Sequence, residues 1–198
     1  MNAPQLPALK IGRLDNLTIN LFAPDHAQRI EGVEIRAFDT VSGVPPLGAY
    51  WPGEGGHNAG LVRGENGQPD YYLIVAAGPA AEFRAEWGGY EHKTDGADSA
   101  SDGMANTKAL LLDSEEHPAA RLAWDYRAAG HADFYLPARR ELQVAEANAP
   151  ELFSKGYHWS STQYSAYDAY GVVFEDGWQS SGVKVDERLV RPVRRKFL

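Results

Sequence analysis

Apolar and polar residues alternate in short runs along most of this chain, and a period of two is typical of β-strands with one buried face. Turn-forming residues at 64–70 lie between two such runs and predict a β-hairpin. Short strands are predicted at residues 17–22, 33–38, 59–63, 71–76, 134–136, 157–162, 169–175, 178–185 and 188–195.

Two stretches carry helix signals instead. Pro118 begins the first predicted helix and Gly130 ends it, and Pro137 opens a second that runs to about Asn148. Residues 88–107, rich in Gly, Asp and Ser, are interpreted as a polar loop. Two helices embedded among short strands indicate an α+β fold. We expect residues 1–40 to form an N-terminal strand extension or oligomerisation arm, and residues 41–198 to form the domain.

The amino-acid composition and charge exclude several classes of function. The chain has no cysteine, which removes disulfide scaffolds, thiolate metal sites and cysteine nucleophiles. Its net charge of −8 argues against nucleic-acid partners. No apolar run is long enough to cross a bilayer, so membrane insertion is not expected. The first residues lack the basic start and apolar stretch of a signal peptide, so we expect synthesis in the cytoplasm.

Basic residues gather near the C-terminus, where residues 184–198 hold six Lys/Arg against two Asp/Glu. We expect Arg188, Arg191 and Arg194 to pair with carboxylates of the acidic remainder of the chain. Arg139 and Arg140 at the start of the second helix are unfavourable for the helix dipole, so each is also expected to have a carboxylate partner.

Seven aromatic residues lie between Tyr157 and Trp178, interleaved with Ser, Gln, Asp and Gly. Rings that provide contact area together with small polar residues that provide adaptable hydrogen bonds are typical of recognition surfaces. Strand phase assigns Trp159 to the core, together with the face shared by Tyr170, Val172 and Phe174. The ligand-binding candidates are the residues left outside that core: Tyr164, Ser165, Tyr167, Asp168, Trp178, Gln179 and Ser180. The alternative is that these rings close the domain or pack against a sister subunit.

The candidate metal ligands are the acidic loop at residues 95–103 and the six histidines. The loop from Asp95 to Gly103, which includes Asp98 and Asp102, offers oxygen ligands for calcium, but its spacing does not match the EF-hand pattern. The six histidines show no paired ligand spacing, and His117 is interpreted as a helix cap before Pro118. No metal site and no cofactor is predicted, and calcium binding by the loop is left open.

Four segments occur in an order that resembles the DUF1566 family, the domain also found at the C-terminus of a Legionella collagen-like adhesin. They are Phe134-Tyr135-Leu136-Pro137-Ala138-Arg139-Arg140-Glu141-Leu142, Tyr157-His158-Trp159-Ser160-Ser161-Thr162, Phe174-Glu175-Asp176-Gly177 and Val190-Arg191-Pro192-Val193-Arg194. The resemblance covers roughly residues 105–198. It implies a C-type-lectin-like fold, with two helices around a small sheet and a loop-and-strand binding face.

Proteins of this broad group serve as adhesins, phage receptor-binding tips and variable proteins of diversity-generating retroelements. The calcium-binding Glu-Pro-Asn, Gln-Pro-Asp and Trp-Asn-Asp triplets of sugar-binding lectins are absent from this chain. Formylglycine-generating enzymes share the fold but use cysteines or copper held by thiolates, which this chain cannot supply.

We therefore expect a non-enzymatic, phage- or prophage-encoded binding protein, virion-associated and homo-oligomeric, with a trimer as one form. Its expected partner is a host-surface protein or glycan receptor. The alternative is a structural virion protein whose aromatic surface is a subunit interface.

Overall fold

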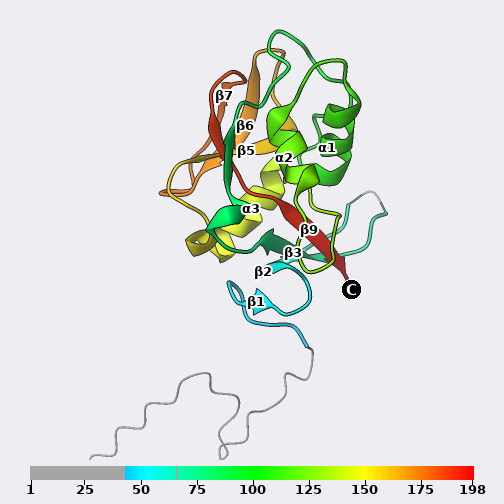
Figure 1. Ribbon diagram of the computed structural model, residues 1–198, viewed down its shortest axis with the longest axis vertical. Coiled ribbons are helices and arrows are strands. Elements are labelled where there is room, and N and C mark those ends of the chain that lie inside the picture. Colours follow the sequence, from blue (N-terminus) through cyan, green and yellow to red (C-terminus); the bar gives the residue numbers. More distant parts are fainter. Residues whose placement is uncertain (1–42, 66) are drawn as a thin grey trace, which may run out of the picture. The chain divides into compact units, whose positions relative to one another are not determined.

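A computed structural model describes residues 43–65 and 67–198 of the protein (Figure 1). The predicted strands at 17–22 and 33–38, and with them the predicted arm at 1–40, lie outside the described residues. The described part has an α+β architecture with two β-sheets, which confirms the predicted class.

The first sheet has four antiparallel strands in the order β1-β2-β3-β9. They are β1 (Tyr50–Trp51), β2 (Gly56–Val62), β3 (Tyr71–Ala76) and β9 (Val193–Phe197). The hairpin predicted around residues 64–70 is confirmed, because β2 and β3 pair across that turn.

The second sheet has five strands in the order β4-β8-β5-β6-β7. They are β4 (Phe83–Ala85), β8 (Arg188–Val190), β5 (Tyr157–Gln163), β6 (Asp168–Val173) and β7 (Gln179–Val183). The β5–β8 pair is parallel, and the other pairs are antiparallel. Strand β7 forms one edge of this sheet.

Three α-helices occur in the described residues, where the sequence predicted two. They are α1 (Gly103–Leu112), α2 (Pro118–Asp125) and α3 (Arg139–Asn148), with 3₁₀ turns at Pro79–Ala81 and Pro150–Leu152. Helix α2 ends earlier than the predicted Gly130, and α1 occupies the end of the segment interpreted as a polar loop and continues beyond it.

The pattern of apolar residues did not predict helix α1, because the buried side of this helix is partly polar. Asn106 and Thr107 are fully buried. Asn106 Nδ2 donates to the Ser99 carbonyl at 2.7 Å, and Thr107 Oγ1 donates to the Gly103 carbonyl at 2.7 Å. These bonds satisfy the buried polar groups, so the helix needs no continuous apolar stripe. The available signal was Asp102, whose carboxylate caps the helix by accepting the Ala105 N–H.

The single strand predicted at 188–195 is two strands that belong to different sheets. Pro192 lies between β8 and β9 and has no N–H to donate to a ladder. The chain therefore leaves the second sheet at Val190 and enters the first at Val193. The short strand predicted at 134–136 is only a single bridge between Tyr135 and Val193.

Two apolar clusters hold the layers together. One packs the first sheet against α3 and one face of β6, and includes Leu73, Leu142 and Val172. The other lies on the opposite face of the second sheet beneath α1 and α2, and includes Trp159 and Leu110. The burial predicted for Trp159 and Val172 is confirmed. Both faces of the β5–β6 pair are thus covered over much of their length. Because β6 is also the first strand of the β6–β7 hairpin, this packing holds that hairpin in position.

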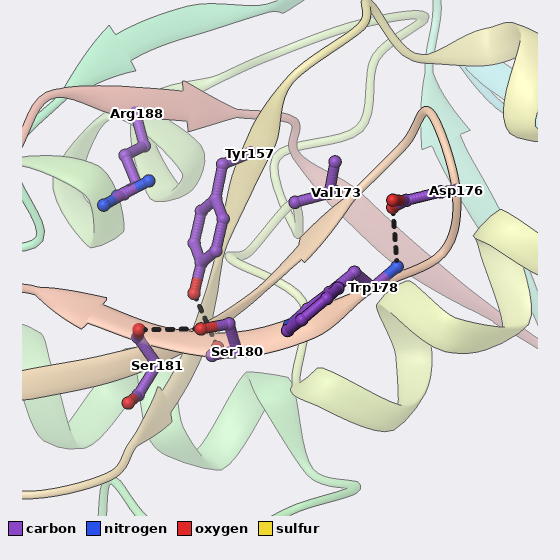
Figure 2. Close-up of a pocket in the computed structure, with 7 residues that line it drawn as sticks. All are labelled: Tyr157, Val173, Asp176, Trp178, Ser180, Ser181 and Arg188. Carbon is purple, nitrogen blue, oxygen red and sulfur yellow. Dashed lines mark hydrogen bonds between the residues drawn. The ribbon is translucent and has the colours of Figure 1, made fainter.

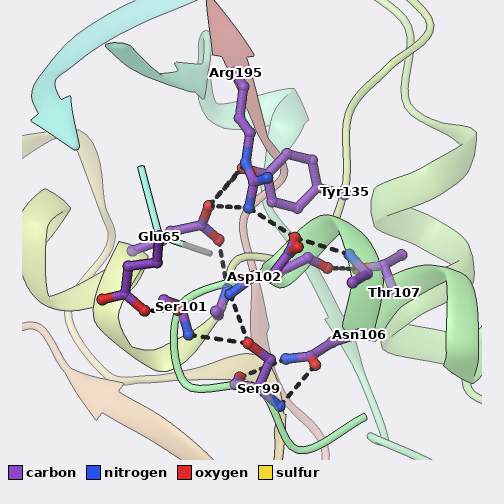
Figure 3. Close-up of polar contacts among 12 residues, drawn as sticks. Glu65, Ser99, Ser101, Asp102, Asn106, Thr107, Tyr135 and Arg195 are labelled. Carbon is purple, nitrogen blue, oxygen red and sulfur yellow. Dashed lines mark hydrogen bonds and ion pairs between the residues drawn. The ribbon is translucent and has the colours of Figure 1, made fainter. Parts of the chain in front are cut away.

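A buried carboxylate joins α3 to the first sheet. Glu141 is fully buried, and its Oε1 accepts hydrogen bonds from the Tyr71 hydroxyl at 2.6 Å and the Tyr135 hydroxyl at 2.7 Å. Arg195 on β9 donates to the same oxygen at 3.0 Å and to Asp102 at 2.9 Å (Figure 3). Burial and the neighbouring Glu141 carboxylate raise the pKa of both tyrosines. This network connects α1, α3, β3 and β9.

The expected pairing of the C-terminal arginines holds for Arg194. It forms ion pairs with Glu54 and with Asp133, the latter at 2.9 Å. Arg191 differs, because its Nε has no hydrogen-bond partner within the described residues. Burial lowers the pKa of Arg191, and the charge of Glu82 acts in the opposite direction.

Of the two arginines that begin α3, one has the predicted carboxylate partner and the other does not. Arg140 has the expected carboxylate partner, Glu65, at 2.8 Å. Arg139 lies over the Tyr170 ring instead, with its guanidinium carbon 4.6 Å from the ring centroid. A cation–π contact therefore takes the place of the predicted ion pair.

Candidate ligand-binding site

The β6–β7 hairpin presents a strip of bare backbone on one face. Gly171 on β6 lies under the Tyr157 ring, and a Cβ at this glycine would come within 2.2 Å of Tyr157 Cε1. Gly182 on β7 lies under the Arg188 guanidinium, where a Cβ would meet Nη2 at 2.9 Å. Glycine in a strand interior often marks such a close approach. The two glycines therefore let a ring and a guanidinium lie flat on the sheet.

Tyr157 is held in place from both sides. Its hydroxyl donates to the Ser180 carbonyl at 2.5 Å, and the Arg188 guanidinium carbon lies 4.1 Å from its ring centroid. Arg188 Nη2 is in turn paired with Asp186 at 2.7 Å, so this arginine has a carboxylate partner, but one within the basic segment 184–198 and not in the acidic remainder of the chain. Burial raises the pKa of the Tyr157 hydroxyl to about 12, although the adjacent Arg188 charge acts in the opposite direction.

A pocket of about 300 Å³ opens beside this ring, with Val173 and the exposed Trp178 among its lining residues (Figure 2). The Trp178 indole is 66% exposed. Asp176, in the turn before β7, accepts the Trp178 backbone N–H at 3.0 Å and so fixes the start of the strand. The tryptophan pocket, as we call it, is completed by Tyr157, Ser180, Ser181 and Arg188.

A second aromatic group, the tyrosine group, lies at the other end of the hairpin. It consists of Tyr90, Tyr164, Tyr167 and Tyr170. Tyr164 is 58% exposed and packs edge-on against Tyr170 at 5.1 Å, whereas Tyr167 is 51% exposed and packs edge-on against Tyr90 at 5.5 Å. Tyr170 is half-buried here, so its assignment to the core was wrong.

The predicted candidates are divided between these two ends. Asp168 pairs with Val183 and Val172 pairs with Gln179, so the strand length separates Tyr167 from Trp178. At about 3.3 Å per residue, that separation is roughly 15–20 Å. The structure therefore does not bring the predicted residues into one patch.

The polar candidates have different surroundings. Ser165 Oγ accepts the backbone N–H groups of Tyr167 and Asp168, each at 3.0 Å, so it shapes the β5–β6 loop. Ser180 lines the tryptophan pocket, while Gln179 faces the other side of the sheet by strand alternation.

The sequence prediction missed Tyr157, Asp176 and Arg188 as pocket residues. The available signal was the pair of strand glycines, Gly171 and Gly182, which indicate side chains lying across the backbone.

A larger pocket of about 780 Å³ lies at the start of α2, with five carboxylates and two arginines among its lining residues. At its edge, His117 is buried and its Nδ1 lies 3.3 Å from the Trp87 carbonyl, so it does not cap α2 through its side chain. Burial lowers the pKa of His117. Burial alone would raise the pKa of Asp113, but hydrogen bonds from Thr94 and from the backbone N–H of Glu115 hold it well below its usual value.

In the part of the chain that the structure describes, no three His, Asp or Glu side chains converge to hold a metal ion. In the loop considered for calcium, Asp102 is engaged by Arg195 and by the Ala105 N–H. None of the helices in residues 43–65 and 67–198 is long and apolar enough to cross a membrane.

No family model matches the sequence, and no curated protein matches it.

Proposed function

We propose that this chain is a non-enzymatic recognition protein that binds a host-surface receptor, a protein or a glycan, through the β6–β7 hairpin. The observation that carries the proposal is the exposure of three large rings at the two ends of one hairpin. Tyr164, Tyr167 and Trp178 are each more than half exposed, whereas Trp159, nearby on β5, is fully buried. Exposed aromatic groups beside hydroxyl and carboxylate groups are typical of binding surfaces.

The resemblance to DUF1566 supports the proposal. It implies a C-type-lectin-like fold, and the four motifs that carry it include β5 and the turn before β7. Within this proposal the protein is phage- or prophage-encoded and virion-associated. It would be a tail-tip or adhesin-like component, or a variable protein of a diversity-generating retroelement. A reverse-transcriptase gene and a near-copy template beside the coding sequence would support the last possibility.

The test is a pull-down of whole bacterial cells with the tagged full chain. Two variants separate the ends of the hairpin: Tyr164→Ala with Tyr167→Ala, and Trp178→Ala. Tyr50→Ala is the matched control, because Tyr50 is 47% exposed and lies on β1 in the other sheet. We expect binding by the wild type and the control, and loss with at least one hairpin variant. Binding that survives both changes would overturn the assignment of the surface.

One observation favours a second function, structural assembly of a virion. Strand β7 is an edge of its sheet, and Val183 and Val185 near its end are 39% and 46% exposed. An edge strand with exposed apolar neighbours can pair with another chain. Light scattering of the full chain tests this candidate. An oligomer, such as a trimer, in which Trp178 is protected from chemical oxidation would favour assembly, and an oligomer that leaves it reactive would favour receptor binding.

A further inference from the structure

The tryptophan pocket has an apolar side that is open to solvent. The Trp178 indole is 66% exposed, and Val173 lies beside it in the pocket lining. The Tyr157 ring lines the same space (Figure 2). An exposed indole provides a flat, amphipathic surface, and a ligand with one apolar face packs against it favourably.

A cationic ligand does not fit this pocket. Aromatic rings next to a carboxylate, here Asp176, would otherwise suit an ammonium group. The Arg188 guanidinium already lies over the Tyr157 ring, with its carbon 4.1 Å from the centroid. That face of Tyr157 is therefore already occupied, and an ammonium group has only donors, so it would leave the remaining N–H groups of Arg188 without an acceptor.

An anionic ligand does not fit either. Arg188 is neutralised by Asp186, since Nη2 and Oδ2 are 2.7 Å apart. Asp176 adds a second carboxylate to the pocket lining. One guanidinium and two carboxylates leave a net negative charge, which opposes a carboxylate or phosphate on the ligand. The favoured ligand is therefore neutral.

The polar side of the pocket needs both a donor and an acceptor from the ligand. Arg188 uses Nη2 for Asp186, and a guanidinium has five N–H donors, so donor capacity remains. Asp176 uses one oxygen for the Trp178 N–H and can accept further bonds. Neutral hydroxyl groups satisfy both, because each donates and accepts.

We propose that the tryptophan pocket binds one neutral sugar ring, with its apolar face on Trp178 and its hydroxyls toward Asp176 and Arg188. The proposal rests on the recognition function above and specifies its ligand. The volume of about 300 Å³ lies at the lower end of small-ligand pockets, which suits a single ring. Such a site needs no calcium.

The experiment is saturation-transfer NMR and titration of the full chain with methyl pyranosides of glucose, galactose, mannose and N-acetylglucosamine. Glucuronate and galacturonate serve as charged probes. We expect saturable binding of at least one neutral glycoside and weaker binding of both uronates. Trp178→Ala should weaken binding at least about tenfold, as expected when a main aromatic contact is lost. Tyr50→Ala should leave it unchanged.

Asp176→Asn separates the ligand classes further. It exchanges a charged acceptor for a weaker neutral one, so a neutral sugar should bind less tightly to the variant. The proposal would be overturned if a uronate bound more tightly than every neutral glycoside, to the wild type or to the variant. It would also be overturned if Trp178→Ala left the affinity for neutral glycosides unchanged. If no glycoside binds while cell capture still requires Trp178, the sugar assignment fails and the recognition function stands. If no glycoside binds and no bacterial cells are captured, both the sugar ligand and the recognition function are refuted.

Discussion

The buried Glu141 carboxylate makes a strong prediction about stability. Four donors meet on its Oε1: the hydroxyls of Tyr71 and Tyr135, and Nε and Nη2 of Arg195. Its Oε2 accepts the Ala138 backbone N–H at 2.8 Å. Glu141→Gln keeps the size of the side chain but replaces one oxygen with an NH₂ group. In either orientation this group faces a donor, so at least one buried hydrogen bond is lost and Arg195 loses a counter-charge.

The magnitude follows from burial. Removing one partner of a buried ion pair costs about 3–5 kcal/mol, because the other charge stays buried without compensation. Asp102 remains within 2.9 Å of Arg195 and keeps part of that compensation. We therefore expect Glu141→Gln to lower the free energy of unfolding by about 3 kcal/mol, the low end of the range. A domain of this kind has a total of about 5–15 kcal/mol, so the variant should remain folded but easily denatured.

The assay is urea denaturation followed by tryptophan fluorescence and circular dichroism at neutral pH. Glu146→Gln is the matched control, since it lies on the same helix, is only half-buried and should change the free energy by less than about 0.5 kcal/mol. A double-mutant cycle between Glu141→Gln and Tyr135→Phe should show coupling, because the two groups share a 2.7 Å bond. A decrease in the free energy of unfolding of less than about 1 kcal/mol for Glu141→Gln would refute the reasoning, because buried donors left without their acceptor cost at least that much.

Three further outcomes are expected. Burial alone would raise the pKa of Glu82, but hydrogen bonds from His158 and Ser154 lower it to about 2. This group therefore stabilises the fold above about pH 4.5 and loses that contribution as pH falls toward 2, and Glu82→Gln should flatten the acid-denaturation curve in this window. Gly171→Ala should displace the Tyr157 ring and cost about 1–3 kcal/mol or more in urea melts. Leu142→Ala should cost about 2–5 kcal/mol in the same melts, because Leu142 is fully buried in the core.

Local patterns predicted much of the fold. Alternation predicted β2, β3, β5, β6 and β7, and proline signals predicted the starts of α2 and α3 to within about two residues. Helix α1 was missed because its buried side combines Leu110 with the polar residues Asn106 and Thr107, whose hydrogen bonds replace a continuous apolar stripe. The split between β8 and β9 was missed because the residues on both sides of Pro192 have a strand pattern. The sequence therefore predicted one strand where Pro192 ends the first ladder.

The candidate site was predicted only in part. Exposure of Tyr164, Tyr167 and Trp178 is a local property that strand phase captures, and it is confirmed. Their separation is set by the pairing register of β6 and β7, which single-sequence patterns do not give. The place of Arg188 in the pocket depends on β8 lying beside β5, a contact between residues far apart in the chain.

The pairing of β3 with β9 also bears on how the chain folds as it is made. Residues 71–75 of β3 bond to residues 193–197 of β9, about 120 positions later, and contacts this distant in sequence slow folding. On the ribosome, β3 has no partner on this side until β9 has left the exit tunnel. At about 5–20 residues per second, β3 waits at least several seconds with that edge open. During this interval a chaperone or a second nascent chain can reach the strand, so synthesis rate and chaperone supply should govern the yield of folded protein.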